Sequence, residues 1–63
     1  MKTDVYPNGF FVLYADKKNL IHYYAYEGTV YSSNGAEIGK GYWRYDQITG
    51  VLEQKDKEWY DKQ

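Results

Sequence analysis

The sequence predicts a mainly β fold: a small antiparallel sheet or partly open barrel of four to five strands, with a short C-terminal helix. Aromatic, β-branched and leucine residues gather in short runs, which favours pleated strands over helices. Turn signals rich in glycine and asparagine separate these runs. The chain has 63 residues and no cysteine, so we expect one small domain over residues 1–63, without disulfides.

The first hairpin is predicted over Phe10–Glu27. It joins a strand at 10–15 to a long strand from Leu20, through a polar four-residue loop at 16–19. This loop length places alternate side chains on one apolar face, which we expect to form the core: Phe10, Val12, Tyr14, Ile21, Tyr23 and Ala25. The other face is amphipathic and is expected to be partly exposed: Phe11, Leu13, Leu20, His22, Tyr24 and Tyr26. A bulge in either strand would reverse this assignment.

A glycine interrupts the long second strand, which continues to Tyr31. Glycine inside a strand pattern predicts a bulge or a sharp bend, so we expect Gly28 to divide the strand into two pairing segments. A second turn ends in Asn34-Gly35. The glycine-rich residues 36–41 that follow fit either a short edge strand or a loop.

The second hairpin is predicted over Tyr42–Gln54, with Gly50 in the left-handed position of its turn. Residues 55–63 lose the alternation of a strand. Their opposite charges stand four residues apart, as at Glu58 and Lys62, which favours a short helix. We expect the core to draw on both hairpins through these residues: Val12, Ile21, Tyr23, Val30, Trp43, Tyr45 and Leu52.

Residues 35–45 resemble one MORN repeat, in which Gly-x-Gly precedes alternating aromatic residues, here Gly39–Gly41 and Tyr42–Tyr45. The overlapping residues 43–52 are similar to a choline-binding-type cell-wall repeat through Trp43, Tyr45, Gly50 and Leu52. Both families are arrays of aromatic hairpins, and such arrays need about three units to bury a core. The resemblance implies a hairpin at this position, and neither family's lipid or cell-wall ligand is carried over.

Composition argues against several classes of function. The formal net charge is −1, from eight Lys or Arg and nine Asp or Glu. Non-specific nucleic-acid binders and membrane-surface proteins usually carry a basic excess, so both are disfavoured. No apolar run approaches the ~20 residues of a membrane span, and the amino terminus lacks the apolar core of a signal peptide. Together with the lack of cysteine, these features lead us to expect a cytoplasmic protein.

Motifs for catalysis, metal binding or cofactor binding are lacking in the sequence. His22 is the only histidine, and nothing in the spacing brings it beside a nucleophile and an orienting acid. One histidine and scattered carboxylates cannot supply a structural zinc site, and the glycines do not match a phosphate-binding loop. We therefore expect no enzymatic activity, no metal and no cofactor.

The aromatic residues are the strongest functional clue, with nine Tyr, two Trp and two Phe. A domain this small cannot enclose all of its large side chains, so some rings must face water. Exposed Tyr and Trp are typical of protein interfaces. We predict a non-catalytic module that masks a surface of a larger protein partner, similar in size to phage or mobile-element accessory and inhibitor proteins. Its predicted contact residues are Phe11, His22, Tyr24, Tyr26, Tyr42 and Arg44.

Two alternative functions would use the same aromatic surface to bind a different class of ligand. Single-stranded nucleic acid could stack its bases on Tyr24, Tyr26 or Tyr42 while Lys40 and Arg44 meet the phosphates. The slight acidic excess of the chain argues against this alternative. A carbohydrate or another small ligand could stack on the same rings. A homodimer is compatible with the small size of the domain.

Overall fold

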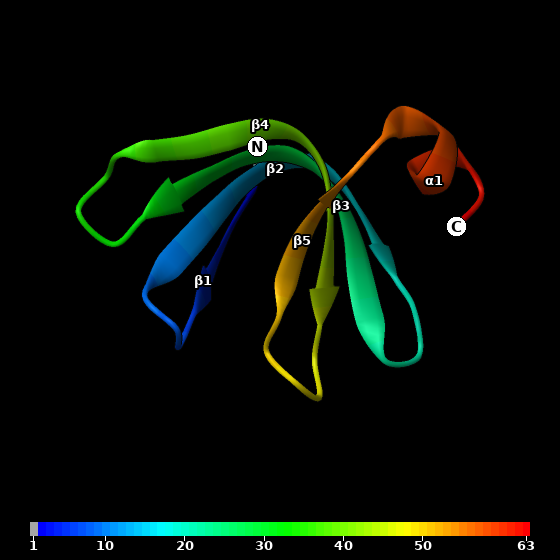
Figure 1. Ribbon diagram of the computed structural model, residues 1–63, viewed down its shortest axis with the longest axis horizontal. Helices are drawn as coiled ribbons and strands as arrows, with labels where there is room; N and C mark the ends of the chain where they lie inside the picture. Colours follow the sequence, from blue (N-terminus) through cyan, green and yellow to red (C-terminus); the bar gives the residue numbers. More distant parts are fainter. Residues whose placement is uncertain (1) are drawn as a thin grey trace.

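The computed structural model describes residues 2–63 and contains one five-stranded antiparallel sheet and a short helix. Each strand pairs with the next in the sequence, in the order β1-β2-β3-β4-β5 (Figure 1). The sheet does not close into a barrel, because β1 and β5 remain its two edges. The elements are β1 (Lys2–Tyr6), β2 (Phe10–Asn19), β3 (Tyr23–Ser32), β4 (Glu37–Asp46), β5 (Leu52–Lys55) and α1 (Lys57–Asp61).

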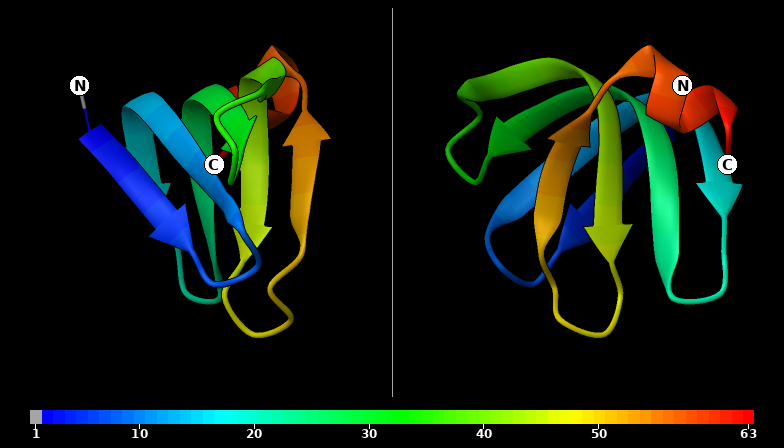
Figure 2. Two further views of the ribbon diagram at one scale, coloured as in Figure 1. Left: turned by 90° about the vertical axis from the view of Figure 1, so that its left-hand side faces the viewer. Right: turned by 45° about the vertical axis from the view of Figure 1, so that its right-hand side comes forward.

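The sheet curves strongly across the middle of its three long strands, so that its two halves face each other like arms (Figures 1 and 2). Strand pairing defines the two halves. The β1 arm consists of β1, Phe10–Tyr14, Thr29–Ser32 and Glu37–Lys40. The β5 arm consists of Asp16–Asn19, Tyr23–Glu27, Tyr42–Asp46 and β5. The concave side of the curve lies between the arms, and the convex side faces outward.

Gly28 lies where the two arms meet, opposite Tyr14 of β2 and Gly41 of β4. A Cβ atom at Gly28 would lie 2.2 Å from the Leu13 carbonyl oxygen and 2.5 Å from the Tyr14 Cα. Both distances are to backbone atoms, which cannot move aside as a flexible side chain can. The predicted role of Gly28 as the point that divides the strand therefore has a steric cause: β2 and β3 approach too closely there for any side chain.

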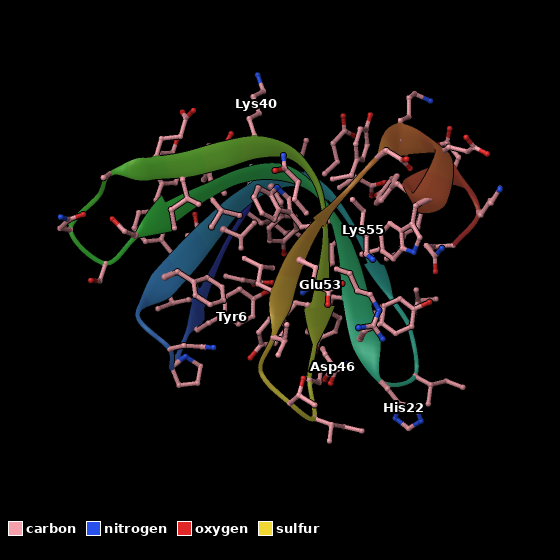
Figure 3. All side chains as sticks on the ribbon, viewed as in Figure 1. Tyr6, His22, Lys40, Asp46, Glu53 and Lys55 are labelled. Atoms are coloured by element: carbon pink, nitrogen blue, oxygen red, sulfur yellow. The ribbon has the colours of Figure 1, made fainter. Side chains whose placement is uncertain are left out.

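The hydrophobic core fills the concave side and consists mainly of rings: Tyr6, Val12, Tyr14, Tyr26, Val30, Trp43 and Tyr45. Contacts within it join the two arms. The Tyr6 and Tyr45 ring centroids are 4.1 Å apart, and Figure 3 shows Tyr6 in the space beneath the arch. Asn8 also donates a hydrogen bond of 2.7 Å to the Gly50 carbonyl, which ties the first turn to the last.

The register of the first hairpin differs from the prediction. Residues 16–19 are not a loop but the end of β2, and the connection to β3 is Leu20–His22. A bulge between Tyr14 and Asp16 shifts the pairing by one residue. Because the side-chain period of a strand is two, this shift moves alternate β3 residues to the other face. Tyr24 and Tyr26 therefore point to the concave side, while Tyr23 and Ala25 point to the convex side.

Most of the predicted core is confirmed: Val12, Val30, Trp43 and Tyr45 are buried, and Leu52 packs against them half-buried. The prediction for Ile21 is wrong, because this residue lies in the β2–β3 connection and is 89% exposed. Tyr23 is half-buried, but on the convex side.

The second hairpin and the C-terminal helix are confirmed, with β4 longer than expected. The glycine-rich residues 36–41 are mostly strand, since β4 begins at Glu37. The helix begins after Asp56, whose carboxylate accepts a hydrogen bond of 2.7 Å from the Trp59 N–H and so caps the first turn. It lies against the convex side of the β5 arm (Figure 2).

Candidate protein-binding surface

The convex side of the β1 arm carries a row of apolar side chains that no other element of residues 2–63 covers. Strand pairing sets Val5 of β1 opposite Phe11 of β2, and Phe11 opposite Tyr31 of β3. The Phe11 and Tyr31 rings stack with centroids 5.1 Å apart and an interplanar angle of 18°. Val5 is 81% exposed. The next row adds Leu13, half-buried between Thr3 and Thr29.

We refer to Val5, Phe11, Leu13 and Tyr31 as the convex patch. Among residues 2–63, the only helix lies at the other end of the sheet, so it does not reach these side chains (Figures 1 and 2). A monomeric sheet can leave one face to solvent, but such a face is normally polar. Here the face of β1, β2 and β3 carries the convex patch beside Thr3 and Thr29, with Val5 exposed and Phe11, Leu13 and Tyr31 half-buried.

The convex side of the β5 arm is sealed instead by Tyr60 of α1, which is 5% exposed. Its ring lies 5.0 Å from the Tyr42 ring, centroid to centroid, and beneath the Lys18 ammonium at 4.2 Å. Its hydroxyl donates a 2.6 Å hydrogen bond to Asp16. Burial, and then the hydrogen bond to Asp16, raise the pKa of the Tyr60 phenol well above its usual range. Ala25, below this cluster, is fully buried.

Further polar contacts hold α1 and the residues after it on this arm. The Lys18 ammonium donates a 2.9 Å hydrogen bond to the Tyr60 carbonyl, near the C-terminal end of the helix. The Tyr23 hydroxyl donates to the side chain of Gln63. The Arg44 guanidinium lies 4.2 Å from the centroid of the Tyr23 ring. The rings on this arm are therefore paired with groups of the same chain.

A groove of about 580 Å³ separates the convex patch from α1. It lies over the junction between the two arms. Leu13 forms one side and Tyr42 the other, and the lining also includes Ala15, Glu27, Gly28, Thr29, Lys40 and Gly41. The groove therefore extends the convex patch towards the helix and brings charged groups of both signs to its border.

The six predicted contact residues do not form one surface. Phe11 lies in the convex patch, whereas Tyr42 and Arg44 lie on the convex side of the β5 arm. His22 is exposed in the β2–β3 connection and points to solvent at its tip (Figure 3). Tyr24 is half-buried on the concave side, 4.7 Å from the Lys17 ammonium.

The predicted exposure of Tyr26 is wrong, because this side chain is fully buried. Its hydroxyl donates a 3.0 Å hydrogen bond to Asp4, which also accepts from Lys17 at 3.2 Å and from Tyr6 at 3.4 Å. The bulge after Tyr14 is the physical reason for the error, since it turns Tyr26 into the core. Burial, and then the Asp4 charge, raise the pKa of Tyr6 far above its usual range.

Val5, Leu13 and Tyr31 belong to the convex patch but were not among the predicted contact residues. The signal for Val5 was its alternation with Tyr6 just before a Pro-Asn-Gly turn, which is the end of a strand. Tyr31 would have been placed beside Phe11 only with the correct register of the first hairpin.

The described residues contain no group of three or more histidine and acidic side chains placed to hold a metal ion. Within residues 2–63, no helix is both long and apolar enough to cross a membrane. No protein-family model, curated protein or solved structure matches this chain. Function must therefore be argued from the surface itself.

Proposed function

We propose that this chain is a small non-catalytic protein-binding module, an accessory or inhibitor protein that uses the convex patch to cover a surface of a larger partner. The observation that carries the proposal is the contrast in covering: Phe11 and Tyr31 stack on an open face beside Val5, which is 81% exposed. Contiguous apolar surface of this kind typically marks a protein contact site. Rigid aromatic side chains there provide wide contact area at a low cost in conformational entropy.

Charge favours a protein partner over nucleic acid. The groove lining carries one acid and one base, Glu27 and Lys40, and Glu37 adds an acid at the open edge of β4, so these residues supply no basic excess. A binder of single-stranded nucleic acid needs a positive groove along the backbone as well as stacking rings. The stacked pair of Phe11 and Tyr31 meets only the second requirement.

The test is affinity capture from host lysate with a matched pair of variants. Val5→Glu puts a charge into the convex patch, and Ile21→Glu puts the same charge on an exposed aliphatic residue, 89% exposed, far from it in the β2–β3 connection. Both sites are open to water, so both variants should fold like the wild type. We expect the bound protein to be lost with Val5→Glu and retained with Ile21→Glu.

Two results would contradict the proposal. One is a partner protein that is recovered equally with both variants, which would place the binding site elsewhere. The other is the recovery of nucleic acid in place of protein, released by moderate salt, which would support the alternative of base stacking.

A further inference from the structure

The outer edge of β4 is open over the first half of the strand. β5 pairs only with Tyr42–Tyr45 of β4. Beyond Lys55 the chain leaves the sheet, because Asp56 caps the start of α1. Among the described residues, Glu37–Gly41 therefore has β3 on one side and no strand on the other, as the right-hand view of Figure 2 illustrates.

The backbone groups of Lys40 point to this open side. Its carbonyl accepts a 3.2 Å hydrogen bond from the side-chain amide of Gln54, a residue of the neighbouring strand β5. A residue of an antiparallel strand directs its N–H and C=O to the same side, so the Lys40 N–H faces outward too. Tyr42, two residues on, pairs with Lys55 on that side, as alternation requires.

The backbone groups of Glu37 also point outward. Ala36 faces β3, because its carbonyl accepts a 2.8 Å hydrogen bond from the Ser32 N–H, and the next residue along a strand faces the other way. Between Glu37 and Lys40 the pairing with β3 slips by one residue, so a bulge takes up the extra residue. The open edge thus presents Glu37 and Lys40, three residues apart.

The two side chains share the convex side of the sheet, since Glu37 is opposite Tyr31 and Lys40 is opposite Thr29. Both are exposed. Neither takes part in an ion pair within residues 2–63. Within residues 2–63 this edge therefore carries an acid and a base without ion-pair partners. Of their outward backbone groups, the Lys40 carbonyl already accepts one hydrogen bond, from the Gln54 side chain.

We propose that a second copy of this chain pairs with this edge, antiparallel, to form a symmetric dimer. A twofold axis between Ile38 and Gly39 sets Lys40 opposite Glu37 of the partner subunit, and symmetry repeats the pair. The outward N–H and C=O of each residue then meet those of its opposite, once the Gln54 side chain has released the Lys40 carbonyl. The spacing matches because both copies contain the same bulge. Each Lys40 also faces a carboxylate directly across the strands, which stabilises an antiparallel pair.

Other symmetric registers bring like charges together. An axis at Lys40 would place two ammonium groups opposite each other, and an axis at Glu37 would do the same with two carboxylates. The corresponding unpaired part of β2 is protected by charges that are already engaged. There Lys17 forms an ion pair with Asp4 at 3.2 Å, and Lys18 is bound to α1.

This dimer does not depend on the proposed function, because its interface is a strand edge and leaves the convex patch uncovered. With the axis perpendicular to the sheet, the convex patches of both copies face the same way. The dimer could therefore engage a partner through two patches at once.

Charge reversal tests the register directly, by sedimentation equilibrium between ~10 µM and ~1 mM. Lys40→Glu leaves two acids on the edge, and Glu37→Lys leaves two bases. We expect either variant alone to raise the dimer dissociation constant by about tenfold or more, because attraction across the strands becomes repulsion. An equimolar mixture of the two variants should associate again, and the double exchange Glu37→Lys/Lys40→Glu should restore the homodimer.

Thermal midpoints serve as the control, since both residues are exposed and neither exchange should alter folding. A wild-type chain that stays monomeric up to ~1 mM would overturn the proposal. A dimer that persists in both single variants, or a mixture that fails to associate, would overturn it as well, because either result requires a different interface.

Discussion

The convex sides of the two arms share strands β2, β3 and β4 and differ in what covers them. On the β5 arm, Tyr60 of α1 packs against Tyr42 and donates a hydrogen bond to Asp16. On the β1 arm, no helix of residues 2–63 packs on the stacked, half-buried rings of Phe11 and Tyr31, and Val5 is 81% exposed. Ring content alone therefore does not identify an interface. A ring that packs against another element of the same chain has a structural role, whereas a ring that no such element contacts is a candidate contact residue.

The largest effect is predicted for a substitution at the junction between the two arms. Gly28→Ala should destabilise the domain by about 3 kcal/mol or more, because the new methyl group would overlap backbone atoms of Leu13 and Tyr14. Such a loss is comparable to the whole stability of a domain this small, roughly 3–9 kcal/mol. Chemical denaturation measures it.

Gly35→Ala is the matched control for this substitution. Gly35 has φ +90°, yet nothing lies within 4 Å of a Cβ built there. Its cost should be only the backbone strain, about 1 kcal/mol. Equal losses for the two variants would show that the close approach at Gly28 does not govern the fold.

The next effect contrasts one ring from each arm. Tyr60→Ala should cost about 3 kcal/mol, because it removes a ring that is 5% exposed, leaves a cavity beside Tyr42 and removes a hydrogen bond to Asp16. Tyr31→Ala should cost about 1 kcal/mol, mostly the stacking with Phe11. Chemical denaturation of the two variants measures both losses of stability. Similar losses would mean that the ring on the open arm contributes to folding as much as the ring on the covered arm.

A smaller effect concerns alkaline stability. The raised pKa values of Tyr6 and Tyr60 mean that the folded chain keeps both phenols neutral where the unfolded chain, with an ordinary pKa of 10.0, ionises them. Stability is therefore fully present below pH 10 and is lost as the pH rises above it. Tyr60→Phe removes one of the two groups, so its denaturation midpoint should fall less steeply between pH 9 and pH 12. An unchanged slope would contradict the assignment of Tyr60.

Much of the fold could be predicted from local patterns. Alternation in Tyr42–Asp46 and the glycine turn after it identified the second hairpin, and the charge spacing of the tail identified α1. The register of the first hairpin could not be predicted in this way. Asp16 and Lys18 look like loop residues because they are polar, but in the folded chain Tyr60, more than forty positions away, satisfies them. A tertiary contact thus overrides the local preference.

The candidate site was predicted only in part, for the same reason. Phe11 was placed on the exposed side correctly, since it precedes the bulge in β2. The prediction for Tyr26 is wrong because this residue pairs with β2 beyond the bulge, which reverses the side of the sheet to which the β3 side chains point. The number of residues in a turn or bulge determines the side of the sheet on which every following side chain lies. The local sequence of Tyr14–Asp16 does not indicate a bulge.

We propose that the β1 arm serves binding through its convex patch, whereas the β5 arm serves folding. The most direct measurement is the amount of partner protein captured by Val5→Glu relative to Ile21→Glu, with the thermal midpoint of both variants recorded. We expect both midpoints to stay within a few degrees of the wild type and only Val5→Glu to lose the partner. Equal capture by the two folded variants would contradict the account.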